Sequence, residues 1–261
     1  MVGDNKWMDT RMRTIILFIL SATLLFPQGI TDKHKSVIAR INAATGGTPP
    51  AAPDTGYFNA SAEWGGTGIF GGTYSTGGTF TVQAGAKLHG DYGYQALLDG
   101  TAGNNFVGAY KNLTATDSCY VRFYVYIDPS FEATADNDFR MLSVNNSGTV
   151  IGDIQIVLDG SGHPFEWLST WRTGGDSTTT TNFSTGAWHE IQIYYKIGTG
   201  SDAKFKIWID GDVIVNAADC SSTYQFNRIY VGILYTDTGV DGSYLNYDDL
   251  VISDTYINSY P

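Results

Sequence analysis

Cysteine, histidine and glutamate are scarce in this chain, and helix-forming runs are missing. Its 261 residues include two cysteines and four histidines. No Cys-x-x-Cys pair and no zinc-type histidine spacing occurs, which argues against a zinc knuckle or a thioredoxin-like site. Long runs rich in Ala, Leu, Glu and Lys are absent, whereas Gly, Ser, Thr, Asp, Asn and Tyr are plentiful. This mix favours many short strands joined by turns, within one sizeable domain.

Positive charge is also in short supply. The formal net charge is −11, and from residue 47 onward 9 Lys and Arg stand against 23 Asp and Glu. The resulting field disfavours nucleic acid and anionic membrane surfaces as partners, tolerates neutral glycans and favours cations. Most of the carboxylates are aspartates, which occur both in turns and among calcium ligands.

The N-terminal region has the features of an export segment. Arg11 and Arg13 precede an apolar run, residues 14–26, which Pro27 closes. The run has the length of a signal-peptide core and is shorter than the roughly 20 residues that span a bilayer. We therefore expect residues 1–30 to be a signal peptide or, because no clean Ala-x-Ala follows, an uncleaved membrane anchor. A buried core helix is the structural alternative. The protein is then secreted or held at the cell surface, and touches a membrane only through this segment.

The next residues connect this segment to the domain. Residues 31–53 combine a short helical stretch with a Pro-rich linker, in "GTPPAAPDTG". We place the domain at residues 54–261.

Period-two alternation dominates the rest of the chain. In "CYVRFYVYI" (119–127), one face carries Cys119, Val121, Phe123, Val125 and Ile127, and the other carries Tyr and Arg. A strand puts these sets on opposite sides of a sheet. The first face is therefore expected in the core, and the second at a solvated or ligand-binding surface.

Similar runs recur at the spacing of a sandwich or barrel. Strands are predicted over residues 139–144, 153–159, 165–172, 189–197, 204–210, 212–216, 228–235 and 245–253, with a Gly-rich set over 68–83 and 94–99. Asp210-Gly211-Asp212 is a tight hairpin signal because Gly accepts positive φ. No helical pattern separates the runs, which argues against a parallel α/β sheet. The expected fold is all-β, an antiparallel two-sheet sandwich, with residues 173–186 as a polar surface loop.

At this point the sequence resembles a known family. The order "WHEIQIYYKI", "KFKIWIDGDVIV", "RIYVGI" and "YLNYDDLVIS" is similar to the C-terminal half of concanavalin A-like lectin/glucanase jelly rolls, particularly their laminin-G-like bacterial branch. "YFNASAEWGGTG", "GDYGYQALLDG" and "CYVRFYVYID" resemble earlier parts of that fold. The resemblance covers roughly residues 56–257 and implies two antiparallel sheets, one of them concave. In members that bind or cleave sugars, the concave face is the glycan groove. Fold alone does not fix activity.

A glucanase mechanism is disfavoured. A retaining glucanase of this superfamily carries Glu-x-Asp-x-x-Glu, because one carboxylate attacks and another protonates the leaving group. The glutamates here are Glu63, Glu132, Glu166 and Glu190, and none has that spacing.

A polysaccharide lyase stays open as an alternative. Lyases with this fold use a Tyr or His base together with Arg or Gln groups that neutralise a uronate. Arg122, Tyr124, Arg140, Gln155 and His163 supply those residue types. The expected arginine and Gln-x-His strand motifs are absent, and "VRFYV" and "IQIVL" are the nearest matches. Such a lyase requires the Arg122/Tyr124 face to be concave and to meet Gln155 and a base.

Aromatic side chains are the favoured sugar platform, because Tyr and Trp combine a flat apolar face with a polar edge. Trp167 and Trp171 share a face of one predicted strand. They stack on sugar rings if that face is concave, and pack in the core if it is not. The candidate carbohydrate-binding residues are Tyr120, Arg122, Tyr124, Arg140, Gln155, Trp167 and Trp171.

Two further sites are predicted. Some related domains bind Ca²⁺ between their first and last strands, so the resemblance makes Glu63 and Asp249 candidate ligands. Asp248 and Asp249 point to opposite faces of a regular strand, so only one of them serves a given site. Cys119 and Cys220 either form a disulfide, if the chain is exported, or stay separate buried thiols.

The function expected from the sequence is an exported, non-catalytic, lectin-like domain that binds a polysaccharide or surface glycan on its concave face. One alternative is a lyase acting on a uronate polymer, and the other is a structural or adhesive surface protein without a glycan site. If the protein is an enzyme, a lyase is favoured over a hydrolase.

Overall fold

We describe a computed structural model of the chain. The described residues are 58–60, 62–101, 105–133, 137–158, 166–171, 175–179, 184–199, 202–217, 223–236 and 241–257; the side chains of residues 59, 64, 132, 133, 137, 138, 157, 158, 166–171, 175–179 and 217 are not described. They all belong to one compact unit, residues 51–259. The predicted signal segment, linker and boundary near Asp54 lie outside the described residues.

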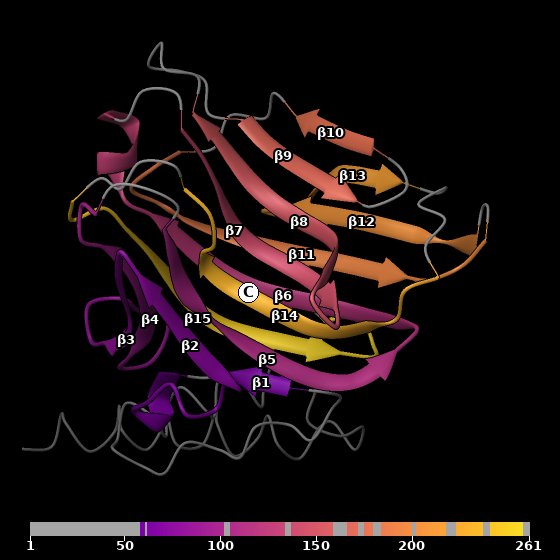
Figure 1. Ribbon diagram of the computed structural model, residues 1–261, viewed down its shortest axis with the longest axis horizontal. Helices are drawn as coiled ribbons and strands as arrows, with labels where there is room; N and C mark the ends of the chain where they lie inside the picture. The colour runs from indigo at the N-terminus through magenta and orange to yellow at the C-terminus, as the bar shows by residue number, and fades with distance from the viewer. Residues whose placement is uncertain are drawn as a thin grey trace, which may run out of the picture. The chain divides into compact units, whose positions relative to one another are not determined.

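Two antiparallel sheets form a sandwich, as predicted (Figure 1). The front sheet faces the viewer in Figure 1 and has the order β10-β9-β8-β7-β14-β5-β2. Its strands are β2 (Gly72–Thr76), β5 (Phe106–Thr116), β7 (Asn137–Asn146), β8 (Thr149–Leu158), β9 (Glu166–Trp171), β10 (Gly175–Thr179) and β14 (Phe226–Ile233).

The back sheet has the order β13-β12-β11-β6-β15-β4-β3, with β1 paired to β15. Its strands are β1 (Phe58–Ala60), β3 (Gly78–Gln83), β4 (Gly93–Leu98), β6 (Ser118–Ile127), β11 (Trp188–Lys196), β12 (Lys204–Ile209), β13 (Asp212–Ala217) and β15 (Tyr244–Ser253). Two short 3-10 helices, η1 (Ala62–Trp64) and η2 (Pro129–Ala133), complete the described elements. No helix within the described ranges is long and apolar enough to cross a membrane.

The inner faces of both sheets make one hydrophobic core. The predicted inward face of β6, from Cys119 to Ile127, is buried, and β12 alternates between partly exposed and buried residues. Tyr247 of β15 crosses the core and donates its hydroxyl to the carbonyl oxygens of Met141 and Gly232, each 3.0 Å away. This contact joins the back sheet to β7 and β14 of the front sheet.

Three strands were not predicted. β1 has only three residues, and β5 buries Val107 and Ala109, which are too small to mark an apolar face. β10 lies inside the stretch 173–186, which was predicted to be a loop, and its backbone pairs with β9. Its Gly, Asp, Ser and Thr residues have low intrinsic strand preference apart from Thr, so the edge of an existing sheet decides their conformation.

The hairpin prediction at Asp210-Gly211 is confirmed. Both residues have positive φ, 52° and 90°, between β12 and β13. Two consecutive residues with φ above zero match a primed turn, whose twist suits an antiparallel hairpin.

A buried histidine ties this hairpin to the segment before β11. His189 Nδ1 lies 2.7 Å from Asp210 Oδ2, and His189 Nε2 lies 2.8 Å from the Ser184 carbonyl oxygen. Burial alone lowers the pKa of His189, but the hydrogen bonds with Asp210 and Ser184 outweigh it, so the net pKa is raised. Both partners are acceptors, and only the imidazolium donates from both ring nitrogens.

The stability of the domain should therefore fall with pH near neutrality. Because the folded pKa of His189 is raised, its contribution is fully present below the unfolded pKa of about 6.5 and is lost as pH rises through the folded pKa. Urea unfolding of the wild type and of His189→Gln, from pH 5 to 9, measures this difference. Burial also raises the pKa of Asp248, which titrates in the variant as well and so cancels in the comparison. A pH-independent difference between the two proteins contradicts the assignment.

Cys119 is buried among the core side chains and forms no disulfide with a residue that the structure describes. Burial raises the pKa of its thiol well above the usual value, which makes it unreactive. Its candidate partner Cys220 lies outside the described residues. Both predicted alternatives, a disulfide or separate buried thiols, therefore stay predictions.

Candidate functional site

The predicted carbohydrate-binding residues do not form one surface. Tyr120, Arg122 and Tyr124 lie on β6 of the back sheet, on the side opposite its core residues. Arg140 and Gln155 are paired on β7 and β8 of the front sheet. The hydrophobic core separates the two sets, so the condition for a lyase built on Arg122 and Tyr124, that their face meets Gln155, is not fulfilled. Alternation shows that residues face away from a core, but not which of two sheets carries them.

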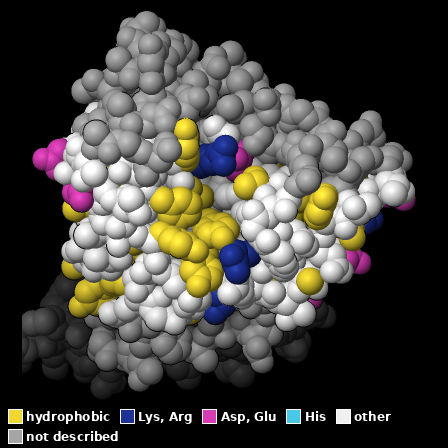
Figure 2. All heavy atoms as spheres, viewed as in Figure 1, with side chains coloured by type: hydrophobic (Ala, Val, Ile, Leu, Met, Phe, Trp, Pro, Cys, Tyr) yellow, Lys and Arg dark blue, Asp and Glu magenta, His cyan; other side chains and the backbone are white. Residues whose placement is uncertain are grey.

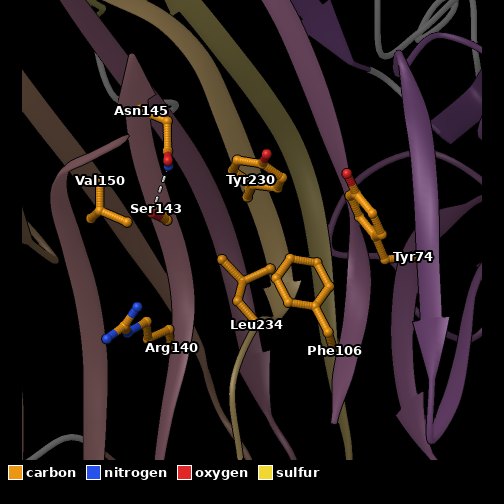
Figure 3. A pocket seen from close by; sticks show the side chains of 8 residues that line it. All are labelled: Tyr74, Phe106, Arg140, Ser143, Asn145, Val150, Tyr230 and Leu234. Carbon is orange, nitrogen blue, oxygen red and sulfur yellow. Dashed lines mark hydrogen bonds between the residues drawn. The ribbon is translucent and has the colours of Figure 1, made fainter. Parts of the chain in front are cut away.

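A groove lies on the outer face of the front sheet. It has a volume of about 330 Å³ and is lined by Tyr74, Phe106, Arg140, Ser143, Asn145, Val150, Tyr230 and Leu234. In Figure 2, hydrophobic side chains gather in the middle of this face, with basic side chains beside them. Figure 3 shows Tyr74, Phe106, Tyr230 and Leu234 on one side of the groove, and Arg140, Val150, Ser143 and Asn145 on the other. Its size suits part of a chain of sugar rings.

Aromatic rings from three strands line one side of the groove. The Tyr74 ring lies 4.9 Å from Phe106, 5.4 Å from Tyr110 and 6.2 Å from Tyr230, centroid to centroid. Glycine makes room for this cluster, because a Cβ at Gly72 would lie 2.7 Å from the Tyr110 ring. Tyr74 is 42% exposed. Burial, with Tyr230 and Tyr110 nearby, raises the pKa of the Tyr74 phenol, so it is neutral at physiological pH.

Arg228 and Tyr230 form a polar pair beside this cluster. Arg228 Nη1 donates to the Tyr230 hydroxyl oxygen over 2.9 Å, and Arg228 Nε donates to Asn112. The guanidinium also lies over the Tyr110 ring, 5.0 Å from its centroid. The hydrogen bond to Tyr230 raises the pKa of Arg228, which keeps it charged. The guanidinium therefore supplies a charged hydrogen-bond donor at the Tyr230 hydroxyl.

Arg140 lies on the opposite side of the groove and forms an ion pair with a buried carboxylate. Its Nε is 3.1 Å from Oδ2 of Asp153, whose side chain is 1% exposed. Gln155 Nε2 donates to Asp153 Oδ1 over 3.3 Å, and Arg140 stacks on the Tyr235 ring at 5.7 Å. Arg140 keeps terminal N–H groups beyond the Nε that faces Asp153, and these suit a carboxylate. Asn145 and Ser143 add a buried hydrogen-bonded pair, 2.8 Å apart (Figure 3).

The polar residues on the back sheet form a separate network. Tyr124 donates its hydroxyl to Glu190 over 2.8 Å, and Gln192 donates to the same carboxylate. Arg122 lies over the Tyr124 ring at 5.8 Å and is 3% exposed. These side chains are bonded to one another on a buried stretch of the sheet, so they are less accessible than the groove.

Carboxylates gather at the bend of β15. Asp248, Asp249 and His89 each offer a ligand atom, and these atoms all lie within 4.8 Å of one another. The prediction that the two aspartates face opposite ways is wrong, because a bulge between Asp248 and Val251, with φ 48° at Asp249, brings both to one side.

Hydrogen bonds within the chain occupy these carboxylates. Asp248 accepts from the backbone N–H groups of Leu88, His89 and Asp249, and Asp249 Oδ2 lies 2.7 Å from His89 Nδ1. Glu63 is not part of the group; it accepts from the N–H groups of Asp91 and Tyr92. The predicted calcium pair of Glu63 and Asp249 therefore stays a prediction.

Sequence reasoning missed most of the groove. Tyr74 and Tyr230 lie in runs that were predicted as strands, but no function was attached to them, and Phe106 lies on the unpredicted β5 together with Tyr110, which packs against Tyr74. The signal for Tyr110 was the pair Gly71-Gly72, which leaves space for a ring on the neighbouring strand. The side chains of Trp167 and Trp171 lie outside the described residues, although their backbone forms part of β9.

Comparison with known proteins gives matches to solved structures only. No protein-family model and no curated protein matches the sequence. An endo-β-1,4-glucuronan lyase from the fungus Trichoderma reesei is 14% identical, with a TM-score of 0.54, over 71% of this chain and 91% of its own. An alginate lyase is 14% identical, with a TM-score of 0.52, over 79% of this chain and 95% of its own.

A third match is part of a much longer protein. A sialidase is 11% identical, with a TM-score of 0.52, over 77% of this chain but 18% of its own. At these identities the matches establish the jelly-roll β-sandwich fold. They agree with the concanavalin A-like resemblance, and polysaccharide lyases stand among the neighbours.

Proposed function

We propose that this protein is a polysaccharide lyase that binds a uronate polymer in the groove of the front sheet. The observation that carries the proposal is the 2.9 Å hydrogen bond from Arg228 to Tyr230 at the edge of an aromatic groove. The proposal is supported by the Tyr230 phenol, the guanidinium groups of Arg140 and Arg228 and the exposed ring of Tyr74, which all lie on the outer face of the front sheet. Lyases acting on glucuronan and alginate among the structural neighbours favour this class over a hydrolase.

A lyase cleaves a uronate chain by elimination. A base removes the proton from the carbon that bears the carboxyl group, the bond from the adjacent carbon to the glycosidic oxygen breaks, and a double bond forms between the two carbons. The leaving oxygen takes up a proton, so no other reactant is consumed. Neutralising the carboxylate stabilises the negative charge that develops on the substrate. No pair of catalytic carboxylates is needed, in contrast to glycoside hydrolysis.

The groove residues match these roles. Tyr230 is the base: its hydroxyl oxygen lines the groove and accepts a hydrogen bond from Arg228, its phenolate form takes the proton from the substrate carbon, and the resulting phenol or water returns a proton to the leaving oxygen. Arg140, held in place by Asp153, pairs with the uronate carboxylate together with the Asn145 amide. The rings of Tyr74 and Phe106 support the sugar faces.

A panel of polymers tests this function. The full chain is incubated with alginate, polyglucuronate, pectate and a neutral β-glucan, with and without a calcium chelator. Ultraviolet absorbance of the unsaturated sugar ends is followed, together with retention on the immobilised polymer. We expect absorbance to rise with at least one uronate polymer and not with the glucan. Retention without any unsaturated product would contradict the lyase proposal.

A non-catalytic, lectin-like domain is the second candidate. It is favoured by the ion pair between Arg140 and Asp153, which already compensates one of the groove cations, and by the lack of histidine among the described groove residues. In that case the same face binds a glycan without cleaving it.

Other sequence-based expectations stay predictions. These are the laminin-G-like branch, export through residues 1–30, location outside the cell and calcium binding. Loss of polymer retention with chelator in the panel would support calcium.

A further inference from the structure

Four aromatic side chains form a cluster on the outer face of the back sheet, away from the groove. Tyr120 of β6 and Tyr194 of β11 are opposite each other and stacked, with ring centroids 4.5 Å apart. Tyr256, which follows β15, meets Tyr120 edge-on at 5.7 Å and Trp208 of β12 at 6.4 Å. Tyr256 is 53% exposed, and the other three are partly exposed. The cluster offers an open aromatic surface across three adjacent strands.

Three lysines lie on the same face, next to these rings. Lys206 is opposite Tyr194, and its ammonium lies 4.5 Å from the centre of the Trp208 ring. Lys204 is directly opposite Lys196 on the neighbouring strand. Alternation puts all three on the outer side, because Phe205, Ile207 and Tyr195 between them are buried. We call the four aromatics and three lysines the basic-aromatic patch.

The lysines are uncompensated within the described part of the chain. None of the three forms an ion pair with a described residue. Like charges directly opposite each other on a sheet are destabilising. The grouping is also unusual for the composition, since the chain has only 9 Lys and Arg after residue 46 and 23 Asp and Glu. An anionic partner would relieve the repulsion that the fold alone leaves in place.

We propose that the basic-aromatic patch is a second glycan-binding site, which holds an anionic polysaccharide on the face opposite the groove. Ring faces stack on the apolar faces of sugars, and the ammonium groups pair with carboxylate or sulfate groups along the chain. Rings that extend over three neighbouring strands suit an extended polymer. The ring faces favour a sugar chain as the polyanion, because they stack on the apolar faces of sugar rings, and the oligonucleotide in the test below measures whether any polyanion binds as well.

The patch works independently of cleavage, so this proposal does not rest on the lyase function. If the groove also binds the same polymer, two sites on opposite faces raise the effective concentration of polymer at the protein. Such a protein remains attached to an insoluble polymer network while its groove is empty. The patch would also retain a chain that the groove rejects.

The test compares charge-removing and charge-preserving variants of the full chain. The double variant Lys204→Gln/Lys206→Gln is matched with Lys204→Arg/Lys206→Arg, and Lys87→Gln controls for charge loss elsewhere. A groove variant, Arg228→Gln/Tyr230→Phe, separates the two faces. Affinity electrophoresis and binding isotherms use alginate, polyglucuronate, a sulfated galactan, a neutral β-glucan and a single-stranded oligonucleotide, at low and high salt.

We expect the glutamine double variant to bind anionic glycans about tenfold more weakly than the wild type, a difference of about 1.4 kcal/mol. The arginine, Lys87 and groove variants should retain patch binding, which high salt weakens. Carboxylated and sulfated polymers distinguish the two sources of negative charge. Wild-type affinity in the glutamine variant, or complete loss of binding in the groove variant alone, would overturn the proposal. So would equally tight binding of the oligonucleotide, or a wild-type dimer that the glutamine substitutions dissociate.

Discussion

Replacing Tyr230 with phenylalanine is expected to lower kcat for cleavage of a uronate polymer about 1,000-fold, with little change in KM. The substitution removes one oxygen atom, the one to which Arg228 donates over 2.9 Å, and leaves the ring in the aromatic cluster. General base catalysis contributes about 10² to 10⁴ in rate, and sugar stacking depends on the ring alone. The loss should therefore appear in turnover rather than in binding.

Tyr74→Phe is the matched control for this prediction. Tyr74 belongs to the same cluster and lines the same groove, but Arg228 donates its hydrogen bond to Tyr230. We expect Tyr74→Phe to keep kcat within a few fold of the wild type. Initial rates of unsaturated-end formation give kcat and KM for both variants. Equal losses in the two variants would mean that general disturbance of the cluster, and not base catalysis, explains the result.

Replacing Gly232 with alanine is expected to cost about 4 kcal/mol of unfolding free energy. Gly232 has φ 136° on β14, where it is paired with Gly108 of β5. A Cβ there would overlap the Val107 carbonyl oxygen and lie 2.5 Å from Gly108 Cα, and both atoms belong to backbone. Neither can move aside without opening the β5–β14 pairing. The Gly232 carbonyl also receives the Tyr247 hydroxyl across the core.

Gly242→Ala separates backbone strain from crowding. Gly242 also has positive φ, 82°, but nothing lies within 4 Å of a Cβ built on it. This variant should cost only the conformational strain, about 1 kcal/mol. Urea unfolding of both variants gives the two free energies. If Gly232→Ala is no more destabilised than Gly242→Ala, close backbone approach is not what requires glycine at position 232.

Periodicity in the sequence determined most of the secondary structure and the core. The inward residues of β6 and β12 follow from alternation, because the pleat sends successive side chains to opposite faces and water exclusion selects the apolar set. The Asp210-Gly211 turn follows from local backbone preference alone. β5 and β10 were not predicted. Val107 and Ala109 of β5 give only a weak apolar pattern, and the edge strand β10 is rich in Ser and Thr.

The groove and the patch were decided by tertiary structure. Tyr74, Tyr110 and Tyr230 are far apart in the chain and meet because β2, β5 and β14 are neighbours in the front sheet. Arg122 and Arg140 are close in sequence and lie on opposite outer faces, because the chain crosses between the sheets after β6.

The bulge at Asp249 likewise turns two adjacent carboxylates to one side, against the alternation of a regular strand. Strand order, crossovers and bulges arise from long-range pairing, which period-two patterns do not encode. The sequence by itself therefore determined which residues face away from the core. Only the packing of the sheets decided which of those residues share a surface.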